Sequence, residues 1–268
     1  SAGARSFGAG NFAQPIAVRR KDELGDLAAD VNAMAHSIHQ MLEAKRTLLL
    51  AISHELRSPI TRARLNTELL PEDGDTGSRR AALLRDLQEM ADLVNDLLES
   101  ERLGAGHSAL HREPTDPAAL AQEVLQAFAA SHPGAPVVLD VAPGLPLLNL
   151  DRTRMRLLLR NLLDNAVRHS AGATQPPQLR VALQGQGASR AITFTVRDHG
   201  PGVPADALPH LAQPFYRPDS SRERATGGVG LGLYLCKLVA HAHGGQFSVR
   251  NAPDSGQTGL EVSVTLPA

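Results

Sequence analysis

The stretch Ser53-His54-Glu55-Leu56-Arg57-Ser58-Pro59 lies inside a long run of residues with helical apolar spacing. Helical periodicity places His54 away from the apolar stripe that contains Ile52, so we expect its imidazole to face water. Pro59 lacks the N–H that would bond to the carbonyl of Glu55, and we expect the helix to kink there. A lone exposed histidine on a helix is far more often inert than catalytic. Its role therefore depends on what chemistry the rest of the chain supplies.

The apolar residues around this stretch recur at steps of three and four over about 45 residues, longer than an ordinary globular helix. They are Leu24, Leu27, Val31, Met34, Ile38, Met41, Leu48 and Ile52. We expect a helix that is capped by Asp22 and packs in a coiled coil with a second copy. The alternative is a single amphipathic helix that packs against its own domain.

A second helix follows a segment rich in turn formers, residues 71–78. We expect Ser78 to cap this helix and the helix to end near Gly104. Its apolar residues Leu83, Leu87, Met90, Val94 and Leu97 repeat the same spacing. Two such helices form an antiparallel hairpin with little interior of its own, and two hairpins complete a four-helix bundle. The pattern thus predicts a homodimer.

The composition of the 268-residue chain narrows its class. Its length predicts two or three domains, and a net charge of -1 argues against nucleic acid as the main partner. Cys236 is the only cysteine, so no internal disulfide can form. The sequence shows no signal peptide and no run of ~18 apolar residues long enough for a membrane span. Its first residues look like an element cut short, so we expect a fragment of a longer protein.

After Gly104 the sequence becomes rich in glycine and proline and loses the helical apolar spacing, which marks a domain boundary. Beyond it we expect helices at 117–131, 152–170 and 231–243, the first opened by Asp116 and the second capped by Asp151. We expect strands at 137–141, 147–150, 178–183, 191–197, 246–251 and 260–266. Strands and helices without regular alternation favour an α/β sandwich with helices on one face of a mixed sheet. Residues 199–229 are too long for a simple connection and suggest a functional lid or disorder.

Three motifs of this second domain carry polar groups. Asn161 and Asn165 are four residues apart and share one helix face, where amides can hold Mg²⁺ or phosphate; the alternative is a pair of solvent-facing amides. Asp198 begins the turn Asp198-His199-Gly200-Pro201-Gly202, and a buried carboxylate there can accept from an exocyclic amine. The run 227–233 is glycine-rich and opens a helix, which makes an anion site. Each motif is weak when taken alone.

The order of these motifs is specific, with Phe215-Tyr216-Arg217-Pro218-Asp219 between the last two. The chain resembles the cytoplasmic part of a bacterial sensor histidine kinase. The resemblance implies residues 1–42 as a partial HAMP-like linker, 43–104 as the dimerisation and phosphoacceptor hairpin, and 105–268 as an ATP-binding domain of the gyrase, chaperone and mismatch-repair family. The fold class is then a helical coiled-coil hairpin in a dimeric four-helix bundle, followed by an α/β sandwich. It also implies a bacterial inner-membrane protein whose membrane segments are absent from this chain.

The resemblance implies roles for particular residues. Asn165 would ligate Mg²⁺, Asp198 would read adenine, and the glycine-rich run would hold the phosphates of ATP. The residues implied at the nucleotide are Asn161, Asn165, Arg168, His169, Asp198, Gly200, Gly202, Phe215, Arg217, Arg222, Gly228, Gly230, Leu231 and Gly232.

The predicted reaction is attack of neutral His54 on the γ-phosphorus of ATP, with Glu55 as general base, followed by transfer to an aspartate of a response regulator. Relatives often carry Thr or Asn at the position of Ser58, which is implicated in dephosphorylating the regulator, and many carry Tyr at the position of His169. Two alternatives stay open. One is an ATP-driven clamp, which would need no histidine on a hairpin, and the other is a scaffold that binds its partner without catalysis.

Overall fold

The computed structural model describes residues 23–72, 74–104, 110–170, 172–185, 189–218, 230–252 and 258–268. The chain divides into two compact units, Ser1–Val94 and Asn95–Ala268. The predicted cap Asp22 and most of the segment that resembles a HAMP linker lie outside the described residues. Among the residues that are described, no helix is both long and apolar enough to cross a bilayer.

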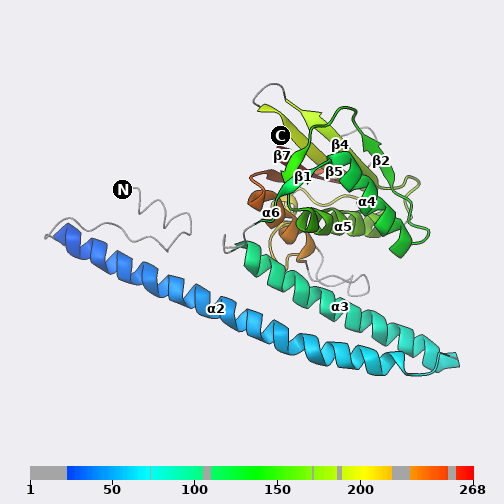
Figure 1. Ribbon diagram of the computed structural model, residues 1–268, viewed down its shortest axis with the longest axis horizontal. Coiled ribbons are helices and arrows are strands. Elements are labelled where there is room, and N and C mark those ends of the chain that lie inside the picture. Colours follow the sequence, from blue (N-terminus) through cyan, green and yellow to red (C-terminus); the bar gives the residue numbers. More distant parts are fainter. Residues whose placement is uncertain are drawn as a thin grey trace. The chain divides into compact units, whose positions relative to one another are not determined.

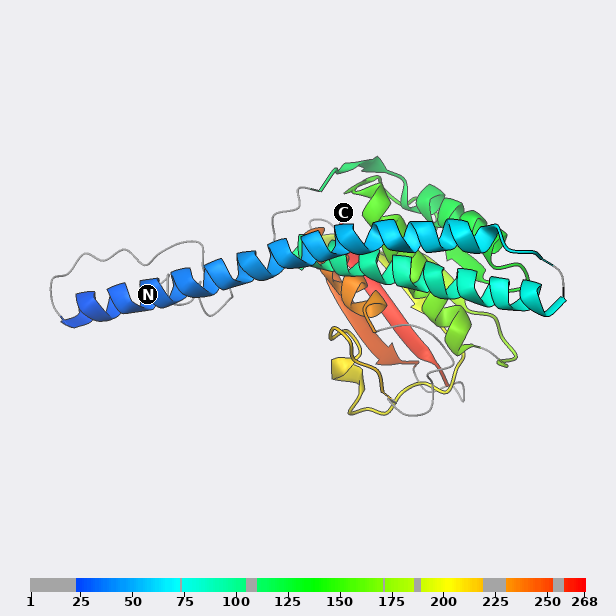
Figure 2. The ribbon, with the colours of Figure 1, turned by 90° about the horizontal axis from the view of Figure 1, so that it is seen from below.

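The first unit is an antiparallel helical hairpin, as predicted (Figures 1 and 2). Helix α2 (Glu23–Glu68) continues unbroken through Pro59. Helix α3 (Gly74–Gly104) follows a short turn and extends past Val94 into the second unit. Two hydrogen bonds join the helices near this turn. Arg64 Nη1 donates to Gln88 Oε1 at 3.1 Å, and Arg80 Nη2 donates to the carbonyl of Glu68 at 3.1 Å.

The start of α3 differs from the sequence prediction. The helix begins at Gly74, so Ser78 lies inside it and the prediction that Ser78 is its cap is wrong. Ion pairs join Arg79 to Asp75 (2.8 Å) and Arg80 to Glu72 (2.9 Å) around this additional turn. A Cβ atom on residue 77 would come within 2.0 Å of the carbonyl oxygen of Glu72, so the tight entry requires the glycine found there.

The second unit contains a five-stranded sheet in the order β2-β4-β5-β7-β6. Its strands are β2 (Val138–Val141), β4 (Gln178–Gln184), β5 (Ala191–Arg197), β6 (Gln246–Asn251) and β7 (Leu260–Pro267). Strand β2 is parallel to β4, and the other neighbours are antiparallel. A separate antiparallel pair joins β3 (Leu148–Leu150) to β1 (Glu113–Thr115), a three-residue strand that the sequence pattern did not predict.

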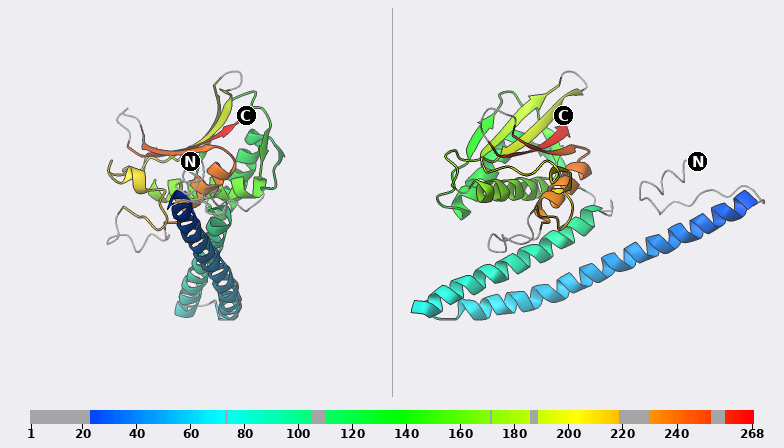
Figure 3. Two further views of the ribbon diagram at one scale, coloured as in Figure 1. Left: turned by 90° about the vertical axis from the view of Figure 1, so that its left-hand side faces the viewer. Right: turned by 180° about the vertical axis from the view of Figure 1, so that it is seen from behind.

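Helices α4 (Pro117–Ser131), α5 (Arg152–His169) and α6 (Gly232–Ala242) lie on one face of this sheet (Figure 3). A short 3₁₀ turn, η2 (Leu208–His210), lies between β5 and α6 in the chain. Asp151 accepts a hydrogen bond from the first turn of α5, as predicted for its cap. Asp116, at the predicted start of α4, accepts from the first turn of that helix. The α/β sandwich is confirmed. Its core is apolar, and the largest fully buried side chains include Phe194, Leu120, Met155, Leu158, Leu159, Leu162, Leu163 and Leu235.

Candidate functional site

The two asparagines lie on α5, whose other side packs into the core. Leu158, Leu162 and Leu163 are buried, while Asn161 and Asn165 are half-buried one turn apart. Asn161 Nδ2 is buried without a hydrogen-bond partner in the described part of the chain. An unpaired buried amide destabilises a fold, so native structures rarely keep one without a reason. A ligand that accepts a hydrogen bond would satisfy Asn161.

The start of α6 lies against both asparagines. A Cβ atom on Gly232 would lie 3.9 Å from Asn161 Cγ and 3.9 Å from Asn165 Nδ2. The first N–H groups of a helix have no partner within it and carry partial positive charge, so they attract phosphate. The structure thus brings together the asparagine motif and the end of the glycine-rich motif, about 70 residues apart in sequence, in one corner whose groups suit an anion.

The Asp198 turn is held in a defined geometry. Asp198 is 6% exposed, and its Oδ1 accepts from the N–H of Gly200 (2.9 Å) and from the N–H of Leu260 (3.0 Å). Its own N–H donates to the carbonyl of Leu260 at 3.0 Å. No described residue donates to Oδ2. This carboxylate oxygen is therefore available to accept from an amine such as that of adenine.

The same turn lies on the carboxyl end of α5. The N–H of His199 donates to Ser170 Oγ at 3.1 Å, and a Cβ atom on Gly200 would come within 2.3 Å of the carbonyl oxygen of His169. Only glycine permits this approach. Arg168 and His169 are exposed on the last turn of α5. Asn161, Asn165 and the Asp198 turn are thus arranged along a single helix.

Two residues that support this turn were not recognised in the sequence. Asn251 Oδ1 accepts from the N–H of Val203 (3.0 Å), and its Nδ2 donates to the carbonyl of Val203 (2.8 Å). Gly259 has φ +139°, and a Cβ atom there would lie 2.2 Å from the carbonyl oxygen of Asp198. In the sequence, Asn251 is only a polar residue at the end of the predicted strand 246–251. This position does not indicate that it bonds to Val203.

The Phe215 segment is joined to the glycine-rich motif. The N–H of Phe215 donates to the carbonyl of Gly230 at 3.0 Å, and Gly230 has φ +80° with Tyr216 close by. Phe215 has φ +63°, which is strained for a residue with a side chain, and it is 60% exposed. Arg217 is half-buried and Leu231 is buried beside Gly232. Arg222 and Gly228 lie outside the described residues.

The electrostatics of the turn favour an uncharged imidazole. Burial lowers the pKa of His199, and the neighbouring Arg197 lowers this pKa further, while the Asp198 carboxylate opposes both effects. We therefore expect His199 to be neutral at pH 7.

The predicted phosphoacceptor lies in the other unit, on α2. The backbone at position 54 is helical, but the His54 side chain lies outside the described part of the structure. Glu55 and Ser58 are exposed, whereas Ser53 is buried, with an exposed fraction of 1%. The predicted general base and the serine are thus accessible from solvent.

The residues present fit ATP with Mg²⁺. No group of three or more His, Cys, Asp or Glu side chains that could hold a metal occurs within the described ranges. Mg²⁺ rarely needs such a cage, because it keeps several waters and is often bound through one or two protein oxygens together with substrate phosphates. The Asn165 amide oxygen, the unpaired Asn161 amide and the helix N-terminus at Gly232 suit this shared binding.

Family comparisons match three consecutive parts of the chain. A HAMP domain model matches residues 1–40, a His Kinase A (phospho-acceptor) domain model matches residues 44–106, and a histidine kinase-, DNA gyrase B- and HSP90-like ATPase model matches residues 150–268.

Curated relatives give the same result over almost the whole chain. The signal transduction histidine-protein kinase AfsQ2 of Streptomyces coelicolor is 32% identical over 94% of this chain and 49% of its own length. The signal transduction histidine-protein kinase BaeS of Escherichia coli is 31% identical over 99% of this chain and 56% of its own length. The chain thus spans about half the length of these relatives.

Among solved structures, full-length ShkA in complex with AMPPNP has a TM-score of 0.66 and 27% identity, over 82% of this chain and 45% of that one. The histidine kinase AdeS of Acinetobacter baumannii, with a TM-score of 0.52 and 23% identity over 80% of this chain and 98% of that one, supports the fold. The order of the matched domains and the similarity to these kinases show that the chain belongs to the family of two-component sensor histidine kinases.

Proposed function

We propose that this chain autophosphorylates His54 from ATP and passes the phosphoryl group to an aspartate of a response regulator. The observation that carries the proposal is the convergence of Asn161, Asn165 and Gly232 at one corner, with an unpaired buried amide on Asn161. The Asp198 turn lies on the same helix and leaves one carboxylate oxygen for the base. The phospho-acceptor domain model matches residues 44–106, which contain His54, and this supports His54 as the acceptor.

The acceptor chemistry follows from the residue types. A neutral imidazole nitrogen of His54 forms a bond to the γ-phosphorus while the bond to the β,γ-bridging oxygen breaks and ADP leaves. Glu55 accepts the proton from the other ring nitrogen, which raises the nucleophilicity of the attacking one. Ser58, one turn further on, orients water for hydrolysis of the phosphorylated regulator. Adjacent helix positions diverge by about 100°, so Glu55 approaches His54 from the side.

At the nucleotide, Asn165 would hold Mg²⁺ and the N-terminus of α6 would hold phosphate. When bound there, Mg²⁺ would supply positive charge against the transferred phosphoryl group. Arg217 and Arg222 supply further positive charge, and Arg168 and His169 line the edge beside the last turn of α5. Gly228, Gly230, Leu231 and Gly232 form the phosphate loop, while Asp198, Gly200 and Gly202 receive adenine and Phe215 flanks the loop.

The proposed organisation has residues 1–42 as linker, 43–104 as dimerisation and phosphotransfer hairpin, and 105–268 as the catalytic domain. Exposed apolar side chains along the hairpin, including Leu27, Met34, Met41 and Leu65, fit a homodimeric four-helix bundle. We place the chain on the cytoplasmic side of a bacterial inner membrane, to which segments outside this sequence attach it. Nucleic acid is not a partner in this proposal.

The test is labelling of the chain with [γ-³²P]ATP. His54→Gln should abolish acid-labile label while the affinity for ATP-Mg²⁺ stays within about twofold, because the nucleotide groups lie in the other unit. His36→Gln, on the exposed surface of the same helix, is the matched control and should label normally. Persistent labelling of the His54 variant would refute the assignment. Steady ATP hydrolysis without any phosphoprotein would favour the ATP-driven clamp instead.

A further inference from the structure

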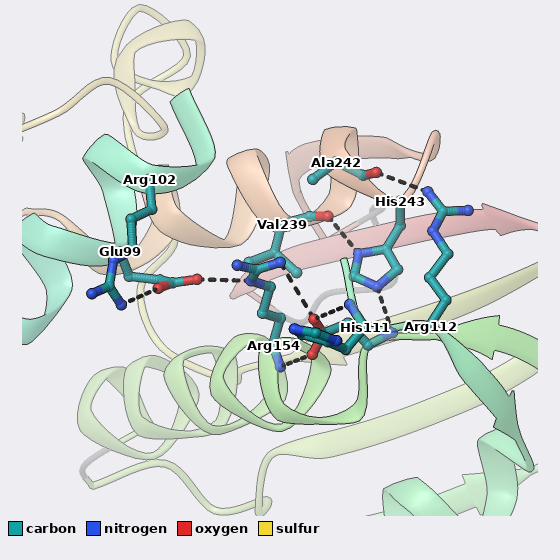
Figure 4. A network of polar contacts seen from close by, with 9 residues as sticks. Glu99, Arg102, His111, Arg112, Arg154, Val239, Ala242 and His243 are labelled. Atoms are coloured by element: carbon teal, nitrogen blue, oxygen red, sulfur yellow. Dashed lines mark hydrogen bonds and ion pairs between the residues drawn. The ribbon is translucent and has the colours of Figure 1, made fainter. Parts of the chain in front are cut away.

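A polar network surrounds the first turn of α5, on the helix that carries both asparagines (Figure 4). Arg154 Nε donates to Glu99 Oε1 at 2.8 Å, and Arg154 Nη1 donates to Asp151 Oδ2 at 3.3 Å. The side chains of Arg154 and Glu99 are only 13% and 18% exposed. Charges this far from water interact more strongly than a surface pair and are costly to leave without a partner.

The network continues to the carboxyl end of α6. The N–H of Asp151 donates to His243 Nε2 at 3.0 Å, and His243 Nδ1 donates to the carbonyl of Val239 at 2.8 Å. Since the Asp151 amide can only donate, Nε2 must be unprotonated and Nδ1 must carry the proton. Arg112 Nη2 donates to the carbonyl of Ala242 at 3.0 Å. The ends of α5 and α6 are therefore fixed to each other.

Glu99 brings α3 into this network. Helix α3 is continuous from Gly74 to Gly104, yet the chain divides into its two compact units between Val94 and Asn95, inside this helix. The last ten residues of α3 thus belong to the α/β unit, where Leu103 joins the apolar core. Leu98 is also buried. The second helix of the hairpin is therefore anchored in the catalytic unit rather than ending before it.

We propose that Arg154 is a positioning residue, whose ion pair with Glu99 holds the end of α3 on the nucleotide-binding helices and thereby sets the rate of phosphoryl transfer to His54. The inference rests on the proposed function and extends it to a residue that is neither the proposed acceptor nor one of the residues proposed to bind the nucleotide. Arg154 precedes Asn161 by seven residues, about 10 Å along a helix that rises 1.5 Å per residue. It acts through α3 and α5.

Nucleotide binding and phosphoryl transfer to His54 depend on different parts of the chain. The groups that bind the nucleotide all lie in the unit Asn95–Ala268, so they need no contribution from the hairpin beyond the end of α3. Phosphoryl transfer also needs His54, which belongs to the unit Ser1–Val94, and α3 is the covalent path between the two. Without the ion pair between Glu99 and Arg154, the α/β unit samples a wider range of positions around the acceptor. The reaction is then slower because fewer of these positions are productive.

The test compares Glu99→Gln with the parent chain in two measurements. We expect the rate of single-turnover labelling at saturating [γ-³²P]ATP to fall about tenfold, the change expected when a hydrogen bond between charged groups is weakened. The affinity for a fluorescent ATP analogue with Mg²⁺ should stay within about twofold. Arg154→Gln should slow labelling at least as much, and Arg154→Lys should recover part of the rate. The Glu99→Gln, Arg154→Gln double variant should be no slower than the slower single variant, because both remove one pair.

Arg156→Gln is the matched control, since Arg156 also lies on α5 and pairs with a glutamate, Glu123, but at an exposed position and without α3. It should label at the parent rate. Protection of Cys236 from alkylation, measured in each variant, shows that the α/β unit is folded. The inference is overturned if Glu99→Gln labels at the parent rate, if its affinity and rate fall together, or if Arg156→Gln is equally slow. Absence of label in the parent chain would instead refute the proposed function.

Discussion

The hairpin and the α/β unit use the same apolar residue types with opposite results. In the α/β unit, leucines such as Leu158 and Leu159 are fully buried by neighbours from the same chain. In the hairpin, Met41 is 72% exposed and Leu65 is 55% exposed. The α/β unit therefore buries these leucines within its own chain. The hairpin leaves large apolar side chains in contact with water in the single chain.

The two units show that a helical pattern in the sequence predicts a buried face without identifying its partner. Apolar residues at steps of three and four predict a helix and a buried face, but they do not say which chain covers that face. In α5 the apolar face is covered by the core of the same unit, to which α4, α6 and the sheet all contribute. In α2 several large apolar side chains, among them Met34 and Met41, are more than half exposed, and a second copy is the occupant we propose for this surface.

The largest expected effect comes from the core of the α/β unit. Leu159→Ala should lower its free energy of unfolding by about 2 to 5 kcal/mol, because it removes buried methyl groups and leaves a cavity. Cys236 gives a local measurement, since it is the only cysteine and is fully buried in this unit. Burial raises the pKa of its thiol, so we expect it to react with alkylating reagents only after unfolding. The urea concentration that exposes Cys236 therefore reports on this unit.

Leu147→Ala is the control for this substitution, because Leu147 belongs to the same unit but is 65% exposed. We expect a change within about 0.5 kcal/mol. If both variants shift the urea midpoint equally, the contrast between buried and exposed leucines does not describe the stability of this unit.

The second effect concerns the hairpin. Leu65→Asp should weaken homodimerisation at least about tenfold, because each copy would bring an unpaired carboxylate into an apolar interface. The measurement is sedimentation across a range of protein concentrations. The midpoint for Cys236 exposure should not change, since that thiol lies in the other unit.

Asn66→Asp serves as the matched control, because it introduces the same carboxylate at the adjacent exposed polar position. It should dimerise like the parent. A monomeric parent chain, or equal dimerisation of all three proteins, would contradict the proposed partner of this exposed apolar surface.

The local pattern predicted the elements of the α/β unit closely. Strand 191–197 and strand 246–251 agree with β5 and β6, because alternating or continuous apolar residues between turn formers are a local signal. Asp116 and Asp151 were found because caps act within three residues. The prediction for Ser78 was wrong because α3 begins four residues earlier, at Gly74, where Gly77 permits the close approach of the Glu72 carbonyl. Strand β1 was missed because its three residues are too short for a pattern to emerge.

The site shows the same limit. Asn161, Asn165 and Asp198 could be selected as polar residues in a meaningful order, and the structure brings these motifs together on α5. Asn251 could not be selected, because its function depends on hydrogen bonds to Val203, 48 residues away. The network of Glu99, Arg154 and His243 joins segments that are up to 144 residues apart, and nothing local distinguishes these residues from ordinary surface charges.

The smallest expected effect is a pH dependence of the stability of the α/β unit, which the hairpin does not share through this group. His243 is 3% exposed in the α/β unit, and burial lowers its pKa from the usual 6.5. Arg112 and Arg154 lower the pKa further, while the hydrogen bond to Val239 and the Asp151 carboxylate oppose them. Between pH 6.5 and this lowered pKa, the unfolded chain binds a proton that the folded chain does not. The stability of the unit is therefore complete above pH 6.5 and is lost as the pH falls through that window.

We expect the melting temperature of the α/β unit, followed by circular dichroism, to decline from pH 7 to pH 5. His243→Asn, whose amide can still donate and accept, should have a flatter profile, with the remaining slope due in part to His199, whose pKa is lowered as well. His241→Asn, at an exposed position of the same helix end, should keep the parent slope. A parent slope in His243→Asn would mean that the buried imidazole does not couple protonation to folding. The pH sensitivity would then have to be sought in other groups of the chain.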